Sequence, residues 1–72
     1  MILSNYIVNV HIIGTYCIRI TIREENAELA LNKAQGMLNV KDGWIHLEDD
    51  FGAKHRIKNE SVTHLSVLQE AL

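Results

Sequence analysis

Apolar and polar side chains alternate along the first third of the chain. Residues 5–12 and residues 16–23 each carry an apolar side chain at every second position, which is the period of a β-strand with one buried face. In the second stretch the separation is complete, because tyrosine and isoleucine take one set of positions while cysteine, arginine and threonine take the other. These patterns predict two neighbouring strands.

The length of the loop between these strands decides whether their apolar faces coincide. With residues 13–15 as a three-residue loop, Val10 lies opposite Ile18 and both apolar sets share one face. A two-residue loop would place Val10 opposite Arg19, and such a slip turns every side chain of one strand to the other face. We therefore predict the hairpin with the odd loop; a single long strand bent at a Gly14 bulge is the alternative.

After residue 23 the apolar period changes from two to alternating threes and fours, the stripe of an amphipathic helix. The stripe consists of Ala27, Ala30, Leu31, Ala34, Met37 and Leu38. Asn26 is suited to cap the first turn, and Gly36 stands where a left-handed residue commonly ends a helix. The pattern predicts a helix of about three turns, and its alanines would let it lie close to a sheet.

Turn chemistry predicts a second hairpin directly after this helix. Asp42-Gly43 is a strong signal for a two-residue type I′ turn. That turn would pair residues 38–41 with residues 44–47, with Val40 opposite Ile45 and Lys41 opposite Trp44. The apolar pairs then fall on one face.

A third hairpin follows from the sequence Asp49-Asp50-Phe51-Gly52, which fits a type I turn with Gly52 in a left-handed bulge position. This loop would set Ile45 opposite Ile57 on the inner face. It would also set Glu48 opposite Lys54 and His46 opposite Arg56 on the outer face. Two independently chosen turns thus predict the same inner face. Such agreement between turn chemistry and the apolar pattern is typical of a correct assignment.

The last strand, residues 61–68, has two registers that the sequence leaves open. A three-residue loop before it points Thr63, Leu65 and Val67 inward. An even loop instead points inward the set Val62, His64, Ser66 and Leu68. Both sets are partly apolar, and a strand that is apolar on both faces is often covered on both. We expect the helix on one side and a second chain on the other.

Taken together, residues 1–72 are predicted to form a single α+β domain with the element order ββαβββ. We expect a small mixed or antiparallel sheet of five to six strands with the one helix packed on one face. At the level of topology this order resembles the β-grasp arrangement, in which a helix lies across a sheet opened by an N-terminal hairpin. The resemblance carries over no activity and no site.

Composition supports a globular chain that gains from association. Hydrophobic residues make up 47% of the chain and charged residues 22%, with no proline. A chain of this length buries only about 60% of its unfolded surface, so we expect a homo-oligomer, dimer or larger. A net charge of -2 argues against general binding to a phosphate backbone except through a local basic patch.

The chain is expected in the cytoplasm. One cysteine cannot form an intramolecular disulfide, the N-terminal stretch lacks the basic start and cleavage site of a signal peptide, and no apolar run reaches the roughly 18 residues of a membrane span. Short acidic reading frames that begin at their own methionine are frequent in phage and mobile elements, so size alone suggests such an origin.

Residues 44–57 crowd acids and histidines around one glycine, which raises the question of a metal or catalytic site. The predicted hairpin accounts for Asp49 and Asp50 as turn residues, and it points His46 and Asp49 to opposite faces. His55 and His64 could approach each other in adjacent strands, but a core role is the simpler interpretation. We found no phosphate loop, nucleophile motif or paired-cysteine pattern, and we interpret Cys17 as a small packing residue. We therefore predict no enzyme activity, no metal and no cofactor.

The remaining candidates are side chains without a structural role, and we expect them to form a binding surface. They are Lys41, Trp44, His46, Lys54, Arg56, Lys58 and Phe51. Tryptophan and arginine are enriched among residues that dominate interface energy, although Trp44 could simply shield the sheet. Lys41 could contact the Trp44 ring as a cation-π pair. Phe51 at a hairpin tip would be either a lid folded back on the domain or an anchor for another protein.

Two classes of function fit this surface. The first is a small non-enzymatic protein that self-associates and binds a protein target as an inhibitor or adaptor. The second is a binder of nucleotides or single-stranded nucleic acid, in which Trp44 stacks on a base while Arg56 and its basic neighbours meet phosphate.

Overall fold

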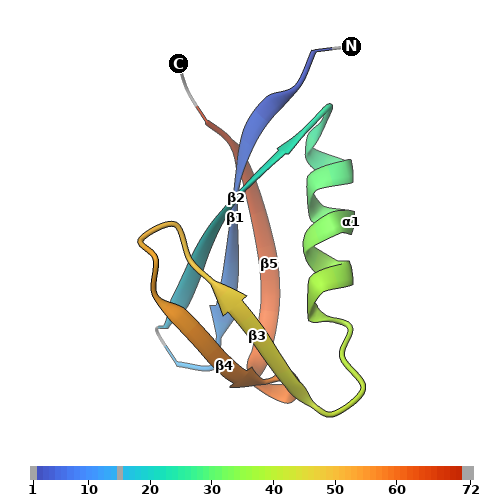
Figure 1. Ribbon diagram of the computed structural model, residues 1–72. Helices are drawn as coiled ribbons and strands as arrows, with labels where there is room; N and C mark the ends of the chain where they lie inside the picture. The colour runs from blue at the N-terminus through green and yellow to red at the C-terminus, as the bar shows by residue number, and fades with distance from the viewer. Residues whose placement is uncertain (1, 15, 71–72) are drawn as a thin grey trace.

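The computed structural model describes residues 2–14 and 16–70 and confirms the mixed α+β class (Figure 1). The described part holds one α-helix, a short 3-10 turn and five strands. Along the chain these are β1 (Ser4–Ile12), β2 (Cys17–Glu24), α1 (Ala27–Leu38), β3 (Trp44–Glu48), β4 (Lys54–Lys58), η1 (Asn59–Ser61) and β5 (Val62–Gln69).

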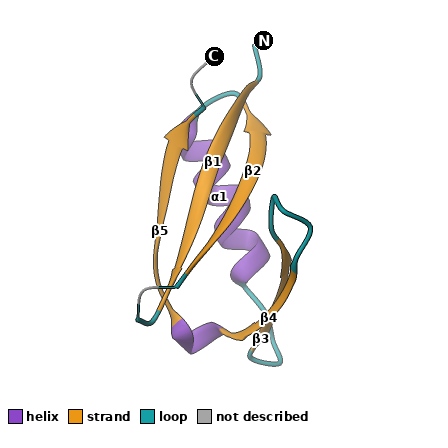
Figure 2. Cartoon of the chain, turned by 90° about the vertical axis from the view of Figure 1, so that its left-hand side faces the viewer, coloured by secondary structure: helices purple, strands orange, loops and turns teal. Residues whose placement is uncertain are grey.

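The strands form two sheets instead of the single sheet we expected. One is an antiparallel sheet in the order β2-β1-β5, and the other is the two-stranded hairpin β3-β4. In Figure 2 the helix lies behind the three-stranded sheet, while β3 and β4 lie beside β2. The hairpin therefore closes the β2 side of the domain, and β5 forms the opposite side.

The first hairpin has the register that the apolar pattern predicts. Val10 pairs with Ile18 and Val8 pairs with Ile20, so the apolar side chains of both strands share one face. Gly14 has a φ of 92° in the connection, and residue 15 of the predicted loop lies outside the described residues. Two paired antiparallel strands rule out the single bent strand.

The helix begins as predicted but ends later. The Oδ1 atom of Asn26 accepts a hydrogen bond of 2.9 Å from the backbone N–H of Leu29, which confirms the N-cap. Gly36 does not end the helix, because α1 continues to Leu38 and the N–H of Asn39 donates back to the Gly36 carbonyl. The predicted alanine contact with the sheet is confirmed, since Ala30 and Ala34 are fully buried.

The hairpin predicted at Asp42-Gly43 is wrong. Because the helix runs on to Leu38, residues 39–43 form a loop and the strand expected at 38–41 does not exist. Gly43 has a φ of 82°, but no non-glycine residue in the described part has the positive φ that a type I′ turn requires. The Asp42 carboxylate instead accepts a hydrogen bond from the N–H of Trp44 at 3.1 Å, which starts β3 directly after the turn.

The β3-β4 register is as predicted. Ile45 pairs with Ile57, His46 with Arg56, and Glu48 with Lys54. Gly52 has a φ of 85°, as the bulge position requires. Accordingly the two alternating sets of side chains in β3 separate cleanly into a buried face and an exposed face.

Neither register considered for the last strand holds along its whole length. Leu65 pairs with Val10 and Val67 with Val8, but a bulge shifts the pairing so that Val62 lies opposite Ile12. The extra residue lets Val62, Leu65 and Val67 all pack against the core. A β-bulge inserts one residue into one strand of a pair, so a fixed period of two could not describe this strand.

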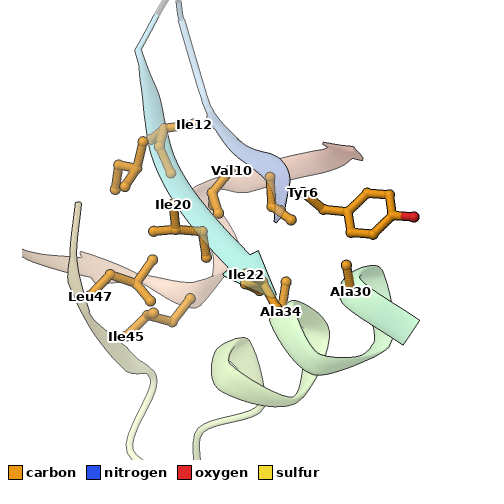
Figure 3. Packing of buried hydrophobic residues seen from close by; sticks show 11 residues of the cluster. Tyr6, Val10, Ile12, Ile20, Ile22, Ala30, Ala34, Ile45 and Leu47 are labelled. Carbon is orange, nitrogen blue, oxygen red and sulfur yellow. The ribbon is translucent and has the colours of Figure 1, made fainter. Parts of the chain in front are cut away.

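The core joins the helix and both sheets. Figure 3 shows Ile45 and Leu47 of β3 in the same cluster as Ile20 and Ala34. The buried apolar residues of the described chain are Tyr6, Val8, Val10, Ile12, Ile18, Ile20, Ile22, Ala30, Ala34, Ile45 and Leu47. Fully burying one such aliphatic side chain contributes about 1.5–3 kcal/mol, so the hairpin is held in place by its inner face.

Candidate binding surface

The outward side chains of β3 and β4 form one continuous exposed surface, which we call the hairpin face. It consists of Trp44, His46, Glu48, Lys54, Arg56 and Lys58, all of which are exposed. Alternation along each strand places these residues together, because Ile45 and Leu47 fill the opposite face. The structure therefore brings together all the predicted binding residues except Lys41 and Phe51.

Trp44 lies at one end of this face and is 41% exposed. The Nζ atom of Lys58 lies 5.5 Å from the centroid of the indole ring, within the range of a cation-π contact. Lys58 is the cross-strand partner of Trp44. The predicted cation-π contact of Lys41 with Trp44 does not form. Lys41 belongs to the loop before β3, so it is not the cross-strand partner of Trp44.

The face carries a row of positive charge along β4. Lys54, Arg56 and Lys58 occupy alternate positions, so successive cations are about 6.6–6.8 Å apart along the strand. Glu48, opposite Lys54, is the one carboxylate of the hairpin face. A shallow hollow on this surface is lined in part by His46, Glu48, Lys54 and Arg56. A chain of net negative charge thus presents a locally basic surface.

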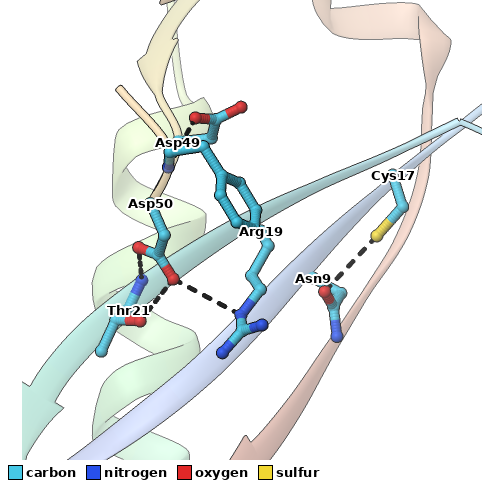
Figure 4. Close-up of polar contacts among 7 residues, drawn as sticks. Asn9, Cys17, Arg19, Thr21, Asp49 and Asp50 are labelled. Carbon is cyan, nitrogen blue, oxygen red and sulfur yellow. Dashed lines mark hydrogen bonds and ion pairs between the residues drawn. The ribbon is translucent and has the colours of Figure 1, made fainter. Parts of the chain in front are cut away.

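Asp50 fastens the hairpin tip to the edge of β2. Its carboxylate accepts from the Thr21 backbone N–H at 2.9 Å and from the Thr21 hydroxyl at 2.5 Å. It also lies 3.5 Å from Nε of Arg19, and the Asp50 N–H donates to the Arg19 carbonyl. Figure 4 shows these side-chain contacts converging on one carboxylate. The tip is therefore held at a fixed place on the domain.

Asp49 organises the turn and binds a histidine. Its Oδ1 atom accepts from the N–H groups of Phe51 and Ala53 at 2.9 Å each. Its Oδ2 atom lies 2.8 Å from Nε2 of His55, whose Nδ1 lies 2.6 Å from the Tyr16 hydroxyl. The hydrogen bond with His55, aided by the two backbone bonds, holds the pKa of Asp49 below its usual range although desolvation acts in the other direction.

Phe51 projects from the anchored tip and is 80% exposed. The lid interpretation is wrong, because a ring folded back on the domain would be buried. The two residues before it, Asp49 and Asp50, each make several hydrogen bonds. Phe51 is thus an exposed aromatic side chain on a well-supported turn.

His55 and His64, which could have approached each other in adjacent strands, lie in different clusters. His64 stacks on His11 with ring centroids 4.0 Å apart, and Nε2 of His11 lies 3.0 Å from the Ser66 hydroxyl. His55 belongs instead to the Asp49 turn. Within the described residues no group of three histidine, cysteine or acidic side chains is arranged to hold a metal ion.

Cys17 is an exposed thiol and not the packed residue we expected. Its Sγ atom lies 3.5 Å from Oδ1 of Asn9 on the face of the three-stranded sheet that points away from the helix (Figure 4). No ionisable group is among its hydrogen-bond partners.

Sequence reasoning missed the groups that position the hairpin. Tyr16 and His55 are 39 residues apart, and Thr21 and Asp50 are 29 apart, so neither pair has a local signal. The one available clue was the second aspartate, because a type I turn needs an acceptor at its first position and Asp49 already supplies it. Asp50 was therefore free to bind another element.

No protein family, curated protein or solved structure matches this chain. In the described part of the chain, no helix has both the length and the apolar character to cross a membrane.

Proposed function

We propose that this chain is a small non-enzymatic interaction protein that self-associates and binds a protein target through the hairpin face, acting as an inhibitor or adaptor. The observation that carries this proposal is the exposed Trp44 with Lys58 beside its ring and Arg56 next along the same surface. Aromatic and arginine side chains dominate binding energy in protein interfaces. Their cost of ordering is reduced here because the supporting strands are fixed by the core.

The hydrogen-bonded chain of Tyr16, His55 and Asp49 supports a structural role in place of catalysis. A histidine held between a carboxylate and a hydroxyl acts as a general base only where a substrate can reach that hydroxyl or the ring. Both nitrogens of His55 already have partners within the domain, and its side chain is only 17% exposed. We therefore assign this chain of contacts to fixing the hairpin tip.

The charge of the hairpin face favours an acidic partner surface. Three cations stand in one row and the single carboxylate of this face lies opposite Lys54. Complementary charge steers association and excludes wrong partners more than it adds affinity. We propose that Trp44 and Phe51 supply apolar contacts while the β4 row selects an acidic target.

The experiment is capture of the target by the tagged chain, followed by purification of the captured protein and titration by isothermal calorimetry. Calorimetry is needed because Trp44 is the one tryptophan of the chain and its alanine variant has no tryptophan fluorescence. Trp44→Ala and Arg56→Ala should each weaken binding by about 2 kcal/mol or more, which is the range of interface hot spots. Lys33→Ala is the matched control, because Lys33 is an exposed cation on α1 that pairs with Glu24. Binding that survives nuclease treatment and is lost only in the hairpin variants supports the proposal. Equal binding by all variants would refute it.

A second candidate, binding of nucleotides or single-stranded nucleic acid, is favoured by the same juxtaposition of an indole and a basic row. Bases stack on aromatic side chains, and this contact contributes about 1–3 kcal/mol per base. A short oligothymidine should then quench Trp44 fluorescence, with an affinity that falls as salt rises. Nuclease-resistant target capture without such quenching decides for the protein target.

We also propose a cytoplasmic location. The support is the exposed thiol of Cys17, which is the one cysteine of the chain and is most stable as a free thiol in a reducing compartment.

A further inference from the structure

The two edges of the three-stranded sheet differ in how they are covered. On β2 the Asp50 N–H donates to the Arg19 carbonyl, and the Thr21 N–H donates to the Asp50 carboxylate. The hairpin tip thus satisfies outward backbone groups of β2. Unpaired groups at a sheet edge are a template for another strand, so this contact removes the template on one side.

The other edge, formed by β5, has no such protection. No segment of the described chain pairs with β5 on the side away from β1. In Figure 2 β5 stands at the far side of the sheet from the β3-β4 hairpin. The eight residues of β5 include no lysine, arginine, acid or proline, the residues that commonly blunt an exposed edge.

Hydrogen-bond alternation identifies which backbone groups of β5 point outward. The Glu70 N–H donates to the Asn5 carbonyl, so residue 70 directs its groups toward β1. In an antiparallel pair such bonded positions recur at every second residue, which assigns Ser66 and Leu68 to β1 as well. Leu65 and Val67 therefore direct their N–H and C=O groups to the open edge.

A groove runs beside this edge between β5 and the helix. Its volume is about 1220 Å³, and its apolar lining includes Leu31 and Leu38 of α1 together with Val62 and Leu65. Apolar side chains of β5 that face the core are only half-buried, whereas those of β1 are fully buried. A strand added to the edge would place alternate side chains over this groove, as in recognition by β-strand addition.

We propose that the occupant is β5 of a second copy of this chain, paired antiparallel across a twofold axis to make a continuous six-stranded sheet. Pairing centred on Ser66 would set Leu65 opposite the second copy's Val67, so the outward backbone groups of both strands meet. The same register keeps the apolar side chains of both copies on the groove side. Because the strand is uncharged, self-pairing brings no like charges together.

This inference rests on the self-association included in the proposed function, and it locates that contact away from the hairpin face. The hairpin lies on the β2 side of the sheet and the open edge on the β5 side (Figure 2). The dimer would therefore present two hairpin faces, both free to bind a target. Loss of dimerisation and loss of target binding are then separable.

The test combines light scattering after size exclusion with amide exchange. Light scattering should give the wild-type chain twice its monomer mass. Hydrogen exchange of the Leu65 and Val67 amides should slow as the protein concentration rises. Ser66→Lys should raise the dimer dissociation constant about tenfold, because the proposed register places the two introduced lysines directly opposite each other. An equimolar mixture of Ser66→Lys and Ser66→Glu should restore the dimer. Asn5→Lys, an exposed substitution on the central strand β1, is the matched control.

Two results would overturn the proposal. One is a wild-type chain that stays monomeric at about 1 mM, where even weak association with a free energy of about -4 kcal/mol is visible. The other is a dimer that Ser66→Lys leaves intact and whose Leu65 and Val67 amides exchange at the same rate at all concentrations. The exchange measurement uses the wild-type chain, so it decides the question even where the lysine variant fails to fold. Target capture by a monomeric variant shows separately whether the hairpin face functions.

Discussion

Replacing Asp50 with alanine tests whether the hairpin tip is fastened to β2. The variant loses two hydrogen bonds with Thr21 and the contact with Arg19, whereas the backbone bond from residue 50 to the Arg19 carbonyl can remain. A hydrogen bond contributes a net of about 0.5–1.5 kcal/mol, and a partly exposed ion pair about 0–1 kcal/mol. We expect the free energy of unfolding to fall by about 2–3 kcal/mol.

That loss is large for a chain of this size. At about 0.05–0.15 kcal/mol per residue, 72 residues provide roughly 4–11 kcal/mol in total. Denaturant unfolding followed by Trp44 fluorescence measures the change, at one fixed low protein concentration because association adds apparent stability. Asp50→Asn is the control, because an amide oxygen still accepts from the Thr21 N–H. It should retain more than half of the stability that the alanine variant loses.

Amide exchange locates the effect. The Thr21 N–H should exchange faster in Asp50→Ala, because its acceptor is gone, while buried amides of β1 should change only with global stability. An alanine variant that unfolds within 0.5 kcal/mol of the wild type, with an unchanged Thr21 amide, would refute the anchoring role of Asp50.

Four further predictions concern the turn, the core, the helix and the loop that follows the helix. The pKa of Asp49 is depressed in the folded chain. The Asp49 carboxylate therefore contributes its full stabilisation above the unfolded pKa, and this stabilisation is lost as pH falls through the folded pKa. Asp49→Asn should flatten that part of the curve of unfolding free energy against pH, measured by urea unfolding. Ile45→Ala should cost about 2–5 kcal/mol in denaturant unfolding, since Ile45 is fully buried. Gly36→Ala should raise the melting temperature, because alanine within the helix is about 0.5–1 kcal/mol more favourable than glycine and nothing lies where its Cβ would be. Gly43→Ala should lower the melting temperature, because alanine at a φ of 82° costs roughly 1 kcal/mol or more.

The parts of the fold that could be predicted are those with a strict period and one buried face. Val10 opposite Ile18 and Ile45 opposite Ile57 follow from alternation, because a shift of one residue would expose a whole apolar set. The helix N-terminus was also predictable, since the Asn26 side chain satisfies a nearby N–H within the same turn. In these places local chemistry and long-range packing favour the same answer.

The sequence-based predictions were wrong where two local signals competed, or where a contact between residues far apart in the chain determined the local structure. Gly36 and Asp42-Gly43 are both ordinary turn signals, but extending α1 lets Leu38 pack against the core, and this outweighs the weak preference for a glycine stop. The bulge at the start of β5 depends on pairing with Ile12, 50 residues earlier. The hairpin face was predictable from strand alternation, whereas its anchor at Thr21 was not.

The hairpin face depends on the core only through its inner side. An isolated two-stranded hairpin is marginally stable at best in water, so β3 and β4 keep their shape because Ile45 and Leu47 are buried and Asp50 is tied to Thr21. Changes on the outer side, such as Trp44→Ala, should therefore alter unfolding free energy much less than Ile45→Ala does. If Trp44 served to shield the sheet, its removal would instead cost stability comparable to a core residue. The difference between these two variants thus separates a surface kept for binding from one kept for folding.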